Sequence, residues 1–463
     1  METNMFMCAM LGRRNVQGQG HFRPSFCTNI QFNVPDSTLQ IQYFFIFFNL
    51  DKCVLNHGAR CMSSLSVENN ENHLLKHLES RIKASGPLTV AEYMKEVLTN
   101  PVSGYYMNRD VFGAKGDFIT SPEISQMFGE LIGIWCVNEW IQAGSEGDLQ
   151  VVELGPGRGT LADDMCRVFS RFSQLKDKVS LHLVEVSPSL SGIQAAKISG
   201  EKNLDEVKLE LSSTPHYYTT VSKYGQPVFW YQSLLDVPKT KMYYIAHEFF
   251  DALPIHKFQK TEKGWQEILV DLAHGRNADN KLCFVLAGGK TAGLTYLQPD
   301  SNDKRDHIEV CPEGGVIVQD LSLRVKEFGG GILIGDYGHD GDKTDTFRGF
   351  KNHELHDVLV EPGTADITAD VDFNYLKRMV QPVGGKLSFY TGISITYSFA
   401  LLQNANTGEW KDMLSGYDML VNPTKMGERF KFLGITADDK KNYTPAGFEN
   451  IPDPDNSDKK NVS

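Results

Sequence analysis

The most constraining feature of this sequence is a run of three glycines at alternate positions directly after an apolar stretch. Residues 149–154 read Leu-Gln-Val-Val-Glu-Leu, and Gly155, Gly157 and Gly159 follow closely. This pattern predicts a buried strand that ends in a tight turn, because glycine lets the backbone turn sharply and lets a ligand approach the main chain. A helix from about residue 161 is expected to follow.

The spacing of these glycines favours one class of ligand. A dinucleotide-binding turn has the pattern Gly-x-Gly-x-x-Gly, which would require glycine where Thr160 stands. Gly-x-Gly-x-Gly after an acidic residue is typical of S-adenosylmethionine sites. That ligand carries a sulfonium and an amino acid, so a carboxylate such as that of Glu153 suits it better than an anion-binding helix end. The sequence therefore predicts S-adenosylmethionine as cofactor and disfavours a nicotinamide dehydrogenase.

A second acidic residue is suitably placed for the ribose of such a cofactor. The run Val179–Ser187 predicts the next strand, with Glu185 at its carboxyl end. Ligands of open α/β sheets bind at these ends, where a carboxylate can accept hydrogen bonds from both ribose hydroxyls. Strand, glycine turn, helix, strand and terminal acid together favour an α/β, Rossmann-like fold.

The chain is expected to have four parts. Residues 1–67 are expected to be a presequence or disordered, because residues 1–35 have a weak transit-peptide composition; for residues 30–60 the alternative is an extension that is not part of the fold. An N-terminal helical region with a lid loop is expected at residues 68–147. A methyltransferase-type sheet domain follows at 148–435, with an antiparallel insertion at about 256–310, and a disordered tail at 436–463 ends the chain.

Apolar patterns predict the individual elements. Helices are expected at 90–98 after a Thr89 cap, at 124–143 and at 161–174. Strands are expected at 149–154, 179–186, 242–246, 267–272, 281–286 and 331–336. Asp336 ends the last of these strands and His339 follows it, so both would lie at the carboxyl edge of the sheet.

Composition excludes several classes of function. The net charge of −12 argues against a nucleic-acid binder. The eight cysteines include no Cys-x-x-Cys pair, so we expect neither a zinc ribbon nor a thioredoxin-type site, and we expect a reducing compartment. The motif at His353, Glu354 and His356 is not the His-Glu-x-x-His of zinc enzymes, so no metal site is predicted. The apolar run at 41–48 is far shorter than the roughly 20 residues of a membrane span.

The most reactive-looking group of residues follows the strand at 242–246. His247, Glu248 and Asp251 come directly after it, interleaved with Phe249 and Phe250. Carboxylates at this place would suit a guanidinium substrate, since Glu248 and Asp251 could bind its N–H fork and a phenylalanine could stack on its face. We therefore take His247, Glu248 and Asp251 as candidate catalytic residues. The alternative is the acidic first turn of a helix, which is common.

A polar, glycine-rich loop precedes the helix at 124–143. It runs from Gly113 to Glu123, and we interpret it as a lid over the cofactor to which Ser121, Pro122 and Glu123 contribute. The alternative is an ordinary helix start with proline in the first turn.

Several long motifs resemble one family. They include Gly116–Gln126, the glycine turn, His247–Pro254, Asp336–His339, Thr364–Phe373 and Met426–Phe430. In this order they resemble the MidA-like mitochondrial methyltransferases, a family of complex I assembly factors that act as protein arginine methyltransferases. The resemblance covers about residues 75–435, whereas the segment 381–415 departs from the family pattern.

The resemblance implies a function and a location. It implies an enzyme of the mitochondrial matrix that symmetrically dimethylates an arginine on the 49-kDa core subunit of respiratory complex I, as complex I assembly requires, with S-adenosylmethionine as methyl donor. Neither a nucleic-acid partner nor a membrane span is expected, and self-association into a homo-oligomer stays open. The departure at 381–415 leaves one alternative from a different class, a non-catalytic assembly scaffold that retains the fold.

Overall fold

The computed structural model describes most of the chain after residue 67. The described residues are 68–107, 120–201, 215–273, 281–298, 303–384, 387–391, 415–416, 418–420, 422–437 and 443–448. The predictions for residues 1–67, for the loop at 113–119 and for most of the divergent segment 381–415 lie outside these ranges.

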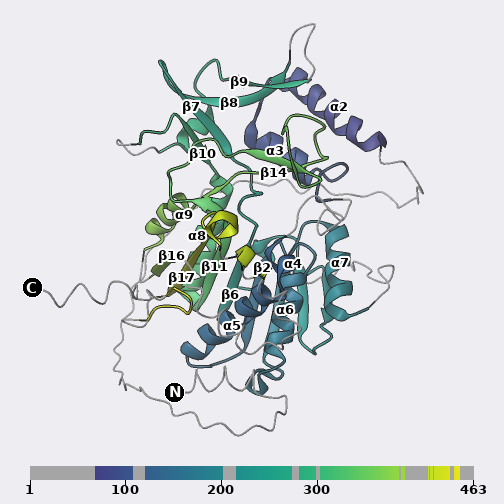
Figure 1. The fold of residues 1–463 in the computed structure, drawn as a ribbon, viewed down its shortest axis with the longest axis vertical. Helices are drawn as coiled ribbons and strands as arrows, with labels where there is room; N and C mark the ends of the chain where they lie inside the picture. The colour runs from purple at the N-terminus through teal and green to yellow at the C-terminus, as the bar shows by residue number, and fades with distance from the viewer. Residues whose placement is uncertain are drawn as a thin grey trace, which may run out of the picture. The chain divides into compact units, whose positions relative to one another are not determined.

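Among the described residues, a nine-stranded mixed sheet forms the centre of the fold (Figure 1). Its order is β16-β17-β11-β6-β2-β3-β5-β4, and the short strand β15 pairs with β11. The five strands β5, β3, β2, β6 and β11 are parallel, whereas β4, β16 and β17 run antiparallel to their neighbours. The strand bounds are β2 Leu149–Leu154, β3 Val179–Val184, β4 Tyr218–Val221, β5 Pro227–Tyr231, β6 Met242–His247, β11 Gly330–His339, β15 Val371–Asp372, β16 Leu387–Thr391 and β17 Phe430–Ala437.

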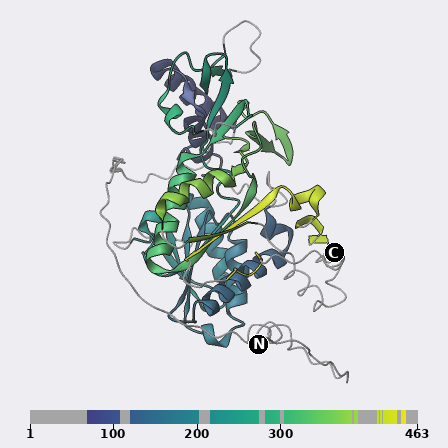
Figure 2. The same cartoon turned by 90° about the vertical axis from the view of Figure 1, so that its left-hand side faces the viewer.

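Helices cover both faces of this sheet because its central strands are apolar on both sides. Alternate residues of β2, β6 and β11, such as Val152 and Ile334, form one core with helices α8 (Pro312–Phe328) and α9 (Phe373–Val380). On the other face Gly331 lies against Trp135 of α5 (Gln126–Gln142). Figure 2 shows β17 in yellow beside the green helices α8 and α9.

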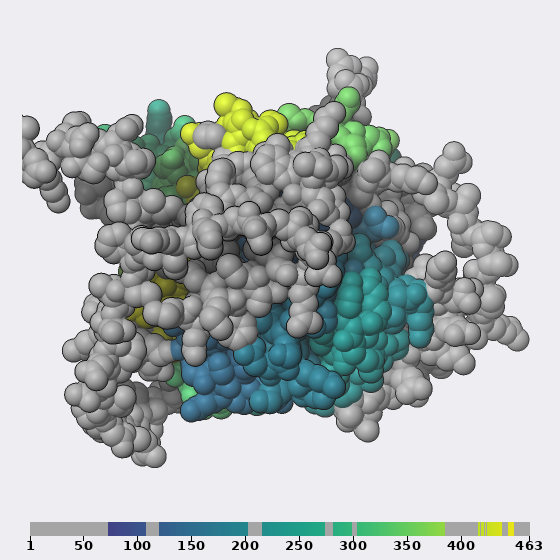
Figure 3. Space-filling view, turned by 60° about the horizontal axis from the view of Figure 1, so that its bottom comes forward, coloured from purple at the N-terminus to yellow at the C-terminus, as the bar shows by residue number. Residues whose placement is uncertain are grey.

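Three helices of the second face pack on one another in chain order. Helix α5 packs on α6 (Thr160–Phe169), and α6 packs on α7 (Pro188–Ser199). Figure 3 shows a face on which atoms of the chain between about residues 120 and 250 form adjoining blue and teal patches. Close packing explains two glycines in α5: a Cβ at Gly129 would lie 2.5 Å from Asp164, and one at Gly133 would lie 3.0 Å from Val168.

The strand order creates a switch point between β2 and β6. After β2 the chain builds β3, β4 and β5 on one side, and it then crosses to β6 on the other side. Ligands of open α/β sheets bind in the crevice at the carboxyl ends of the strands where the order reverses. The glycine turn after β2 and the acidic residues after β6 both lie at this crevice.

The predicted antiparallel insertion is confirmed. A second sheet contains β7 (His256–Thr261), β8 (Gly264–Leu272), β9 (Leu282–Leu286) and β10 (His307–Val310). The helices α2 (Glu68–Ser85) and α3 (Val90–Thr99) share a core with this sheet, because the strand β1 (Leu88–Thr89) between them pairs with β8. The predicted helical region is therefore divided: α2 and α3 belong with the insertion, and α4 (Ser121–Ile124) and α5 with the central sheet.

The remaining elements are short. Strands β12 (Arg348–Lys351), β13 (Glu354–His356) and β14 (Asp366–Thr368) form a three-stranded sheet. One-turn helices lie at Ser173–Leu175, Leu234–Asp236, Ala292–Thr295, Gln381–Val383 and Pro423–Gly427. No helix among the described residues is long and apolar enough to cross a membrane.

Most predicted elements are confirmed, with two differences. The six predicted strands correspond to β2, β3, β6, β8, β9 and β11, but the helix predicted at 161–174 ends at Phe169, and only a single turn follows. The tail was expected to be disordered from Thr436, yet Thr436 and Ala437 complete β17. Further along, Tyr443 donates a hydrogen bond to Glu139 of α5. The start of the tail was thus placed too early.

Two buried tyrosines allow a matched test of this packing. Tyr93 of α3 donates its hydroxyl hydrogen to the carbonyl oxygen of Val358 at 2.6 Å. Tyr243 of β6 has a buried hydroxyl that makes no hydrogen bond within the described residues. We expect Tyr93→Phe to lower the free energy of unfolding by about 1–3 kcal/mol, and Tyr243→Phe to leave it nearly unchanged. Urea unfolding of both variants checks this, and equal losses would contradict the assigned pairing.

Candidate functional site

The glycine turn has the conformation that its sequence predicts. Gly155, Gly157 and Gly159 all have positive φ angles, of 61°, 53° and 75°. A Cβ at Gly159 would lie 3.2 Å from the backbone of Gln194, and a Cβ at Gly155 would lie 2.8 Å from the ring of Phe249. Backbone conformation therefore calls for glycine at all three positions, and close packing adds to this at two of them.

A cavity of about 40 Å³ lies against this turn. Its walls come from the turn itself, from Thr120 and Pro122 before and within α4, from Glu153 of β2, and from His247 and Glu248 at the end of β6. The β2–β6 register places Leu154 opposite Ala246, so Gly155 and His247 are the first residues beyond the paired segment. Three segments far apart in the sequence thus meet at the switch point.

The chemistry of Glu153 fits the predicted cofactor. Its side chain is buried, and its Oε2 atom has no hydrogen-bond partner in the structure. Burial, together with the nearby Asp164, raises the pKa of Glu153 to about 8. A buried carboxylate of this kind is stabilised by a cationic ligand, and the amino acid part of S-adenosylmethionine carries an ammonium group. The glycine turn and Glu153 therefore fit this cofactor.

Glu185 lies at the carboxyl end of β3, as predicted. Its Oε1 accepts a hydrogen bond from the Ser187 N–H at 2.7 Å, and its Oε2 accepts one from Gln194 Nε2 at 2.9 Å. Burial raises its pKa to about 7. A carboxylate offers about four acceptor positions, so two remain for a ribose. Glu185 does not line the small cavity, and its role toward the cofactor stays a prediction.

The residues after β6 form a turn held by β11. The N–H group of Glu248 donates to the carbonyl oxygen of Gly335 at 3.0 Å. The N–H groups of Phe249, Phe250 and Asp251 all donate to Asp336 Oδ2, at 3.1, 2.9 and 3.3 Å. Residues 248–253 form bends and turns, and the chain then enters β7. The alternative of an acidic first helical turn is therefore wrong.

Glu248 has an unusual backbone and an incompletely paired side chain. Its φ angle is 47°, a left-handed conformation that costs a non-glycine residue on the order of 1–3 kcal/mol. Ser121 donates to Glu248 Oε1 from its N–H at 3.2 Å and from its hydroxyl at 2.8 Å. The Oε2 atom is buried and has no hydrogen-bond partner in the structure. Burial raises the pKa of Glu248 to about 8.

His247 and Asp251 take different positions beside Glu248. His247 lines the cavity, and its ring packs against Phe128 and Phe430, with centroids 4.7 and 5.5 Å away. Burial lowers the pKa of His247 to about 3, so the imidazole is neutral. Asp251 is buried outside the cavity wall, and burial next to Asp336 and Asp366 raises its pKa well above its usual value. Glu248 and His247 thus line the cavity, whereas Asp251 does not.

The two phenylalanines also differ. Phe250 is a core residue between β6 and α8, so it cannot stack on a substrate. Phe249 lies over Gly155, which lines the cavity, but Phe249 is not itself among the lining residues.

Helix α4 holds the other candidate residues. Ser121 contacts Glu248, Pro122 lines the cavity, and Glu123 forms an ion pair with Arg158 of the glycine turn at 3.6 Å. Direct cofactor binding by Ser121 and Glu123 stays a prediction. What the contacts show is that α4 is joined both to the glycine turn and to Glu248.

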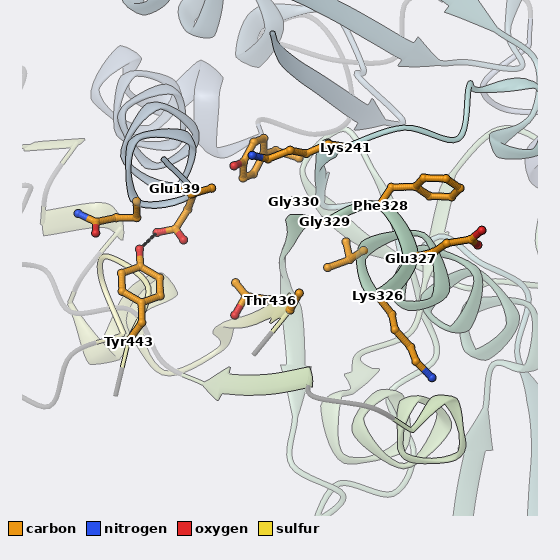
Figure 4. Close-up of a pocket in the computed structure, with 14 residues that line it drawn as sticks. Glu139, Lys241, Lys326, Glu327, Phe328, Gly329, Gly330, Thr436 and Tyr443 are labelled. Atoms are coloured by element: carbon orange, nitrogen blue, oxygen red, sulfur yellow. Dashed lines mark hydrogen bonds between the residues drawn. The ribbon is translucent and has the colours of Figure 1, made fainter. Parts of the chain in front are cut away.

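A larger cavity of about 390 Å³ lies at the opposite edge of the sheet (Figure 4). Its lining includes Lys241 and Gly330 at the amino ends of β6 and β11, and the end of α8. Glu139 and Tyr443, joined by a hydrogen bond, form another part of the wall. Because ligands of such sheets bind at the carboxyl ends, we place the candidate active site at the smaller cavity.

Sequence reasoning missed two residues that organise the site. Gln194 donates to both the Gly157 carbonyl and Glu185, and it accepts a hydrogen bond from Trp230. The sequence marks Asp336 only as a residue at the sheet edge, whereas its carboxylate accepts four backbone N–H groups in the structure. No local pattern marks either contact, although the place of Asp336 at the end of an apolar strand pattern is a usable signal. The described residues contain no cluster of side chains that could hold a metal ion.

Fold, glycine turn and buried acidic residues define a class of protein, the S-adenosylmethionine-dependent methyltransferases. The family model described as "Putative S-adenosyl-L-methionine-dependent methyltransferase" matches residues 131–390. The chain is similar in fold to a solved structure of a likely methyl transferase from Burkholderia thailandensis, which is bound to S-adenosyl-homocysteine. The TM-score is 0.63 at 19% identity, and the match covers 81% of this chain and 95% of that chain.

Curated relatives are much closer in sequence. The chain is 54% identical to "Protein arginine methyltransferase NDUFAF7, mitochondrial" of Bos taurus, over 80% of this chain and 85% of the relative. It is 52% identical to the Homo sapiens protein of the same name, over 80% and 84%, and 44% identical to the Drosophila melanogaster homolog, over 83% and 91%. The chain therefore belongs to the NDUFAF7 family of S-adenosylmethionine-dependent methyltransferases.

A pair of glycines tests the cofactor turn. Gly157→Ala and Gly147→Ala both place a Cβ on a residue with positive φ, 53° and 71° respectively, at a cost of about 1–2 kcal/mol. Only Gly157 lines the cavity, and Gly147 has no atoms near its Cβ position. We expect similar losses in melting temperature but weaker S-adenosylmethionine binding for Gly157→Ala alone, measured by calorimetry. Unchanged affinity in Gly157→Ala would contradict the placement of the cofactor.

Buried acidic residues with raised pKa values make stability depend on pH. Glu153 and Glu248, each with a pKa near 8, retain protons in the folded state that the unfolded state loses at a lower pH. The free energy of unfolding should therefore fall as pH rises from about 4.5 to 8, by up to about 1.4 kcal/mol per pH unit for each group.

Denaturant unfolding at pH 6 and pH 8.5, without cofactor, measures this slope. Glu248→Gln should flatten it, whereas Glu313→Gln, at an exposed position of α8, should not. An equal slope in wild type and Glu248→Gln would contradict the assignment.

Proposed function

We propose that this protein is a mitochondrial protein arginine methyltransferase that uses S-adenosylmethionine. In detail, we propose that it symmetrically dimethylates an arginine on the 49-kDa core subunit of respiratory complex I in the matrix, as complex I assembly requires. The names of the relatives support arginine as the target and mitochondria as the location. The symmetric product, the subunit and the matrix rest on the family resemblance.

One observation carries the choice of a guanidinium substrate. Glu248 lines the same cavity as Glu153 and the glycine turn, and its buried Oε2 atom has no hydrogen-bond partner among the described residues. A second acidic residue, Asp251, lies behind Glu248, and both have raised pKa values because they are buried near other carboxyl groups. A cation at this place would relieve that penalty.

The residues have separable tasks in methyl transfer. S-adenosylmethionine, when bound, supplies an electrophilic methyl group on a sulfonium. Ser121 fixes Glu248 Oε1, so Oε2 is the atom left to accept N–H groups of the arginine. Because binding of a cation favours the ionised form, Glu248 gives up its proton when the guanidinium enters. His247 stays neutral and forms an apolar, water-excluding wall with Phe128.

Glu248→Gln tests this arrangement. Glutamine keeps the size and one acceptor but loses the charge that pairs with arginine, so turnover should fall at least tenfold, or about 1.4 kcal/mol of transition-state stabilisation. Cofactor affinity should stay within about twofold. Mass spectrometry of the recombinant 49-kDa subunit after incubation measures methylation, and Glu313→Gln is the matched control. Normal methylation by Glu248→Gln would remove Glu248 from the mechanism.

The same assay tests the finer proposals. Acid hydrolysis and chromatography separate symmetric from asymmetric dimethylarginine, and only the symmetric product agrees with the proposal. A wild-type protein that binds the 49-kDa subunit and S-adenosylmethionine but methylates no arginine would instead favour the scaffold alternative.

A further inference from the structure

We propose that Asp336 is a positioning residue for arginine methylation, because its carboxylate holds the turn that aims Glu248 at the cavity. This inference rests on the proposed function, and it concerns a residue outside the cavity wall. Asp336 lies on β11, is fully buried and does not line the cavity.

The geometry of the two strands explains why Asp336 has this position. In the parallel pairing of β6 with β11, His247 is opposite Gly335, which is the last paired position. Asp336 is therefore one residue beyond the end of the pairing, level with the start of the turn. The backbone carbonyl of Gly335 takes the N–H of Glu248, and the side chain of Asp336 takes the next three.

A carboxylate is well suited to this task. Asp336 Oδ2 accepts the N–H groups of Phe249, Phe250 and Asp251, and Oδ1 accepts that of Tyr337 at 2.8 Å. Burial raises the pKa of Asp336 to about 7, but the four N–H groups that it accepts favour its ionised form, so we assign Asp336 as ionised and Asp251 as the protonated partner. An amide side chain has one oxygen and one NH₂ group. Its NH₂ group would therefore face backbone N–H donors at one of the two positions, where no hydrogen bond can form.

The contacts of Asp336 compensate the strain at Glu248. A left-handed glutamate persists only when its surroundings hold it, and such residues concentrate at active sites. The N–H of Glu248 and the three N–H groups that follow it are all held by β11. Without Asp336, the turn can relax to a more common conformation, and the carboxylate of Glu248 would leave Ser121 and the cavity.

Charge gives Asp336 a second measurable effect. Its negative charge adds to burial in raising the pKa of Glu248. Glu123 acts in the same direction, while Ser121 lowers this pKa through its hydrogen bonds, and His247 is neutral. The rise of kcat/KM with pH reports the ionisation of Glu248 in the free enzyme. Removal of the Asp336 charge should therefore shift this rise to lower pH.

Two variants separate position from charge. Asp336→Asn should lower kcat at least tenfold on the 49-kDa subunit, shift the acidic limb of the kcat/KM profile to lower pH, and speed hydrogen exchange of the amides of Phe249–Asp251. Asp336→Glu keeps the charge but displaces the oxygen, so it should lower kcat and leave the limb in place. Cofactor affinity should remain within twofold in both variants.

Glu309→Gln is the matched structural control. Glu309 is also buried and accepts backbone N–H groups, those of Thr346 and Phe347, but it lies in the insertion sheet. We expect this variant to lose stability and to keep kcat. If Asp336→Asn does not fold, kcat and hydrogen exchange at the amides of Phe249–Asp251 are measured in Asp336→Glu instead, and these two results test the positioning role.

The outcomes distinguish this inference from the proposed function. Unchanged kcat in a folded Asp336→Asn protein whose wild type is active would overturn the positioning role and leave arginine methylation standing. Loss of kcat without faster exchange at Phe249–Asp251 would also overturn it. A wild type that methylates no arginine would overturn the function itself, and exchange would still show whether Asp336 holds the turn.

Discussion

The parallel pairing of β2 with β6 is the constraint on which the candidate site depends. It puts Leu154 opposite Ala246, so the glycine turn and the His247–Asp251 turn leave the sheet side by side. A shift of one residue in either strand would exchange core-facing and opposite-facing side chains along its whole length. Apolar residues on both faces of β2 and β6 oppose such a shift, since helices bury both faces.

Two buried carboxylates share the small cavity between these turns. Among the described residues, one oxygen of Glu153 and one of Glu248 have no hydrogen-bond partner, and burial raises the pKa of both side chains. Unpaired buried carboxyl groups destabilise a fold, so their presence at one place indicates that the site is shaped for cationic ligands. The cofactor and the proposed arginine substrate both carry positive charge.

The sequence predicted those parts of the molecule that local patterns encode. The spacing of Gly155, Gly157 and Gly159 predicted a tight turn, and runs of apolar residues predicted the strands around it. The contacts of Asp336 with residues 249–251 and of Gln194 with Gly157 join residues far apart in the chain, so no local pattern predicts them. The helix alternative at Glu248 failed for the same reason: the N–H groups of that turn bind β11, not helical carbonyls. The division of the helical region depended on β1, a two-residue strand too short to recognise from sequence.

The position of β17 affects the order in which the protein can assemble. This strand lies between β11 and β16, yet it is formed by Phe430–Ala437, long after the other residues of the site have been synthesised. Until it arrives, β11 has an open, apolar edge, which is a template for association with other chains. A chain shortened before Phe430 would retain every candidate cofactor and catalytic residue. We nevertheless expect such a chain to aggregate through the open edge of β11 before it can fold into an active protein.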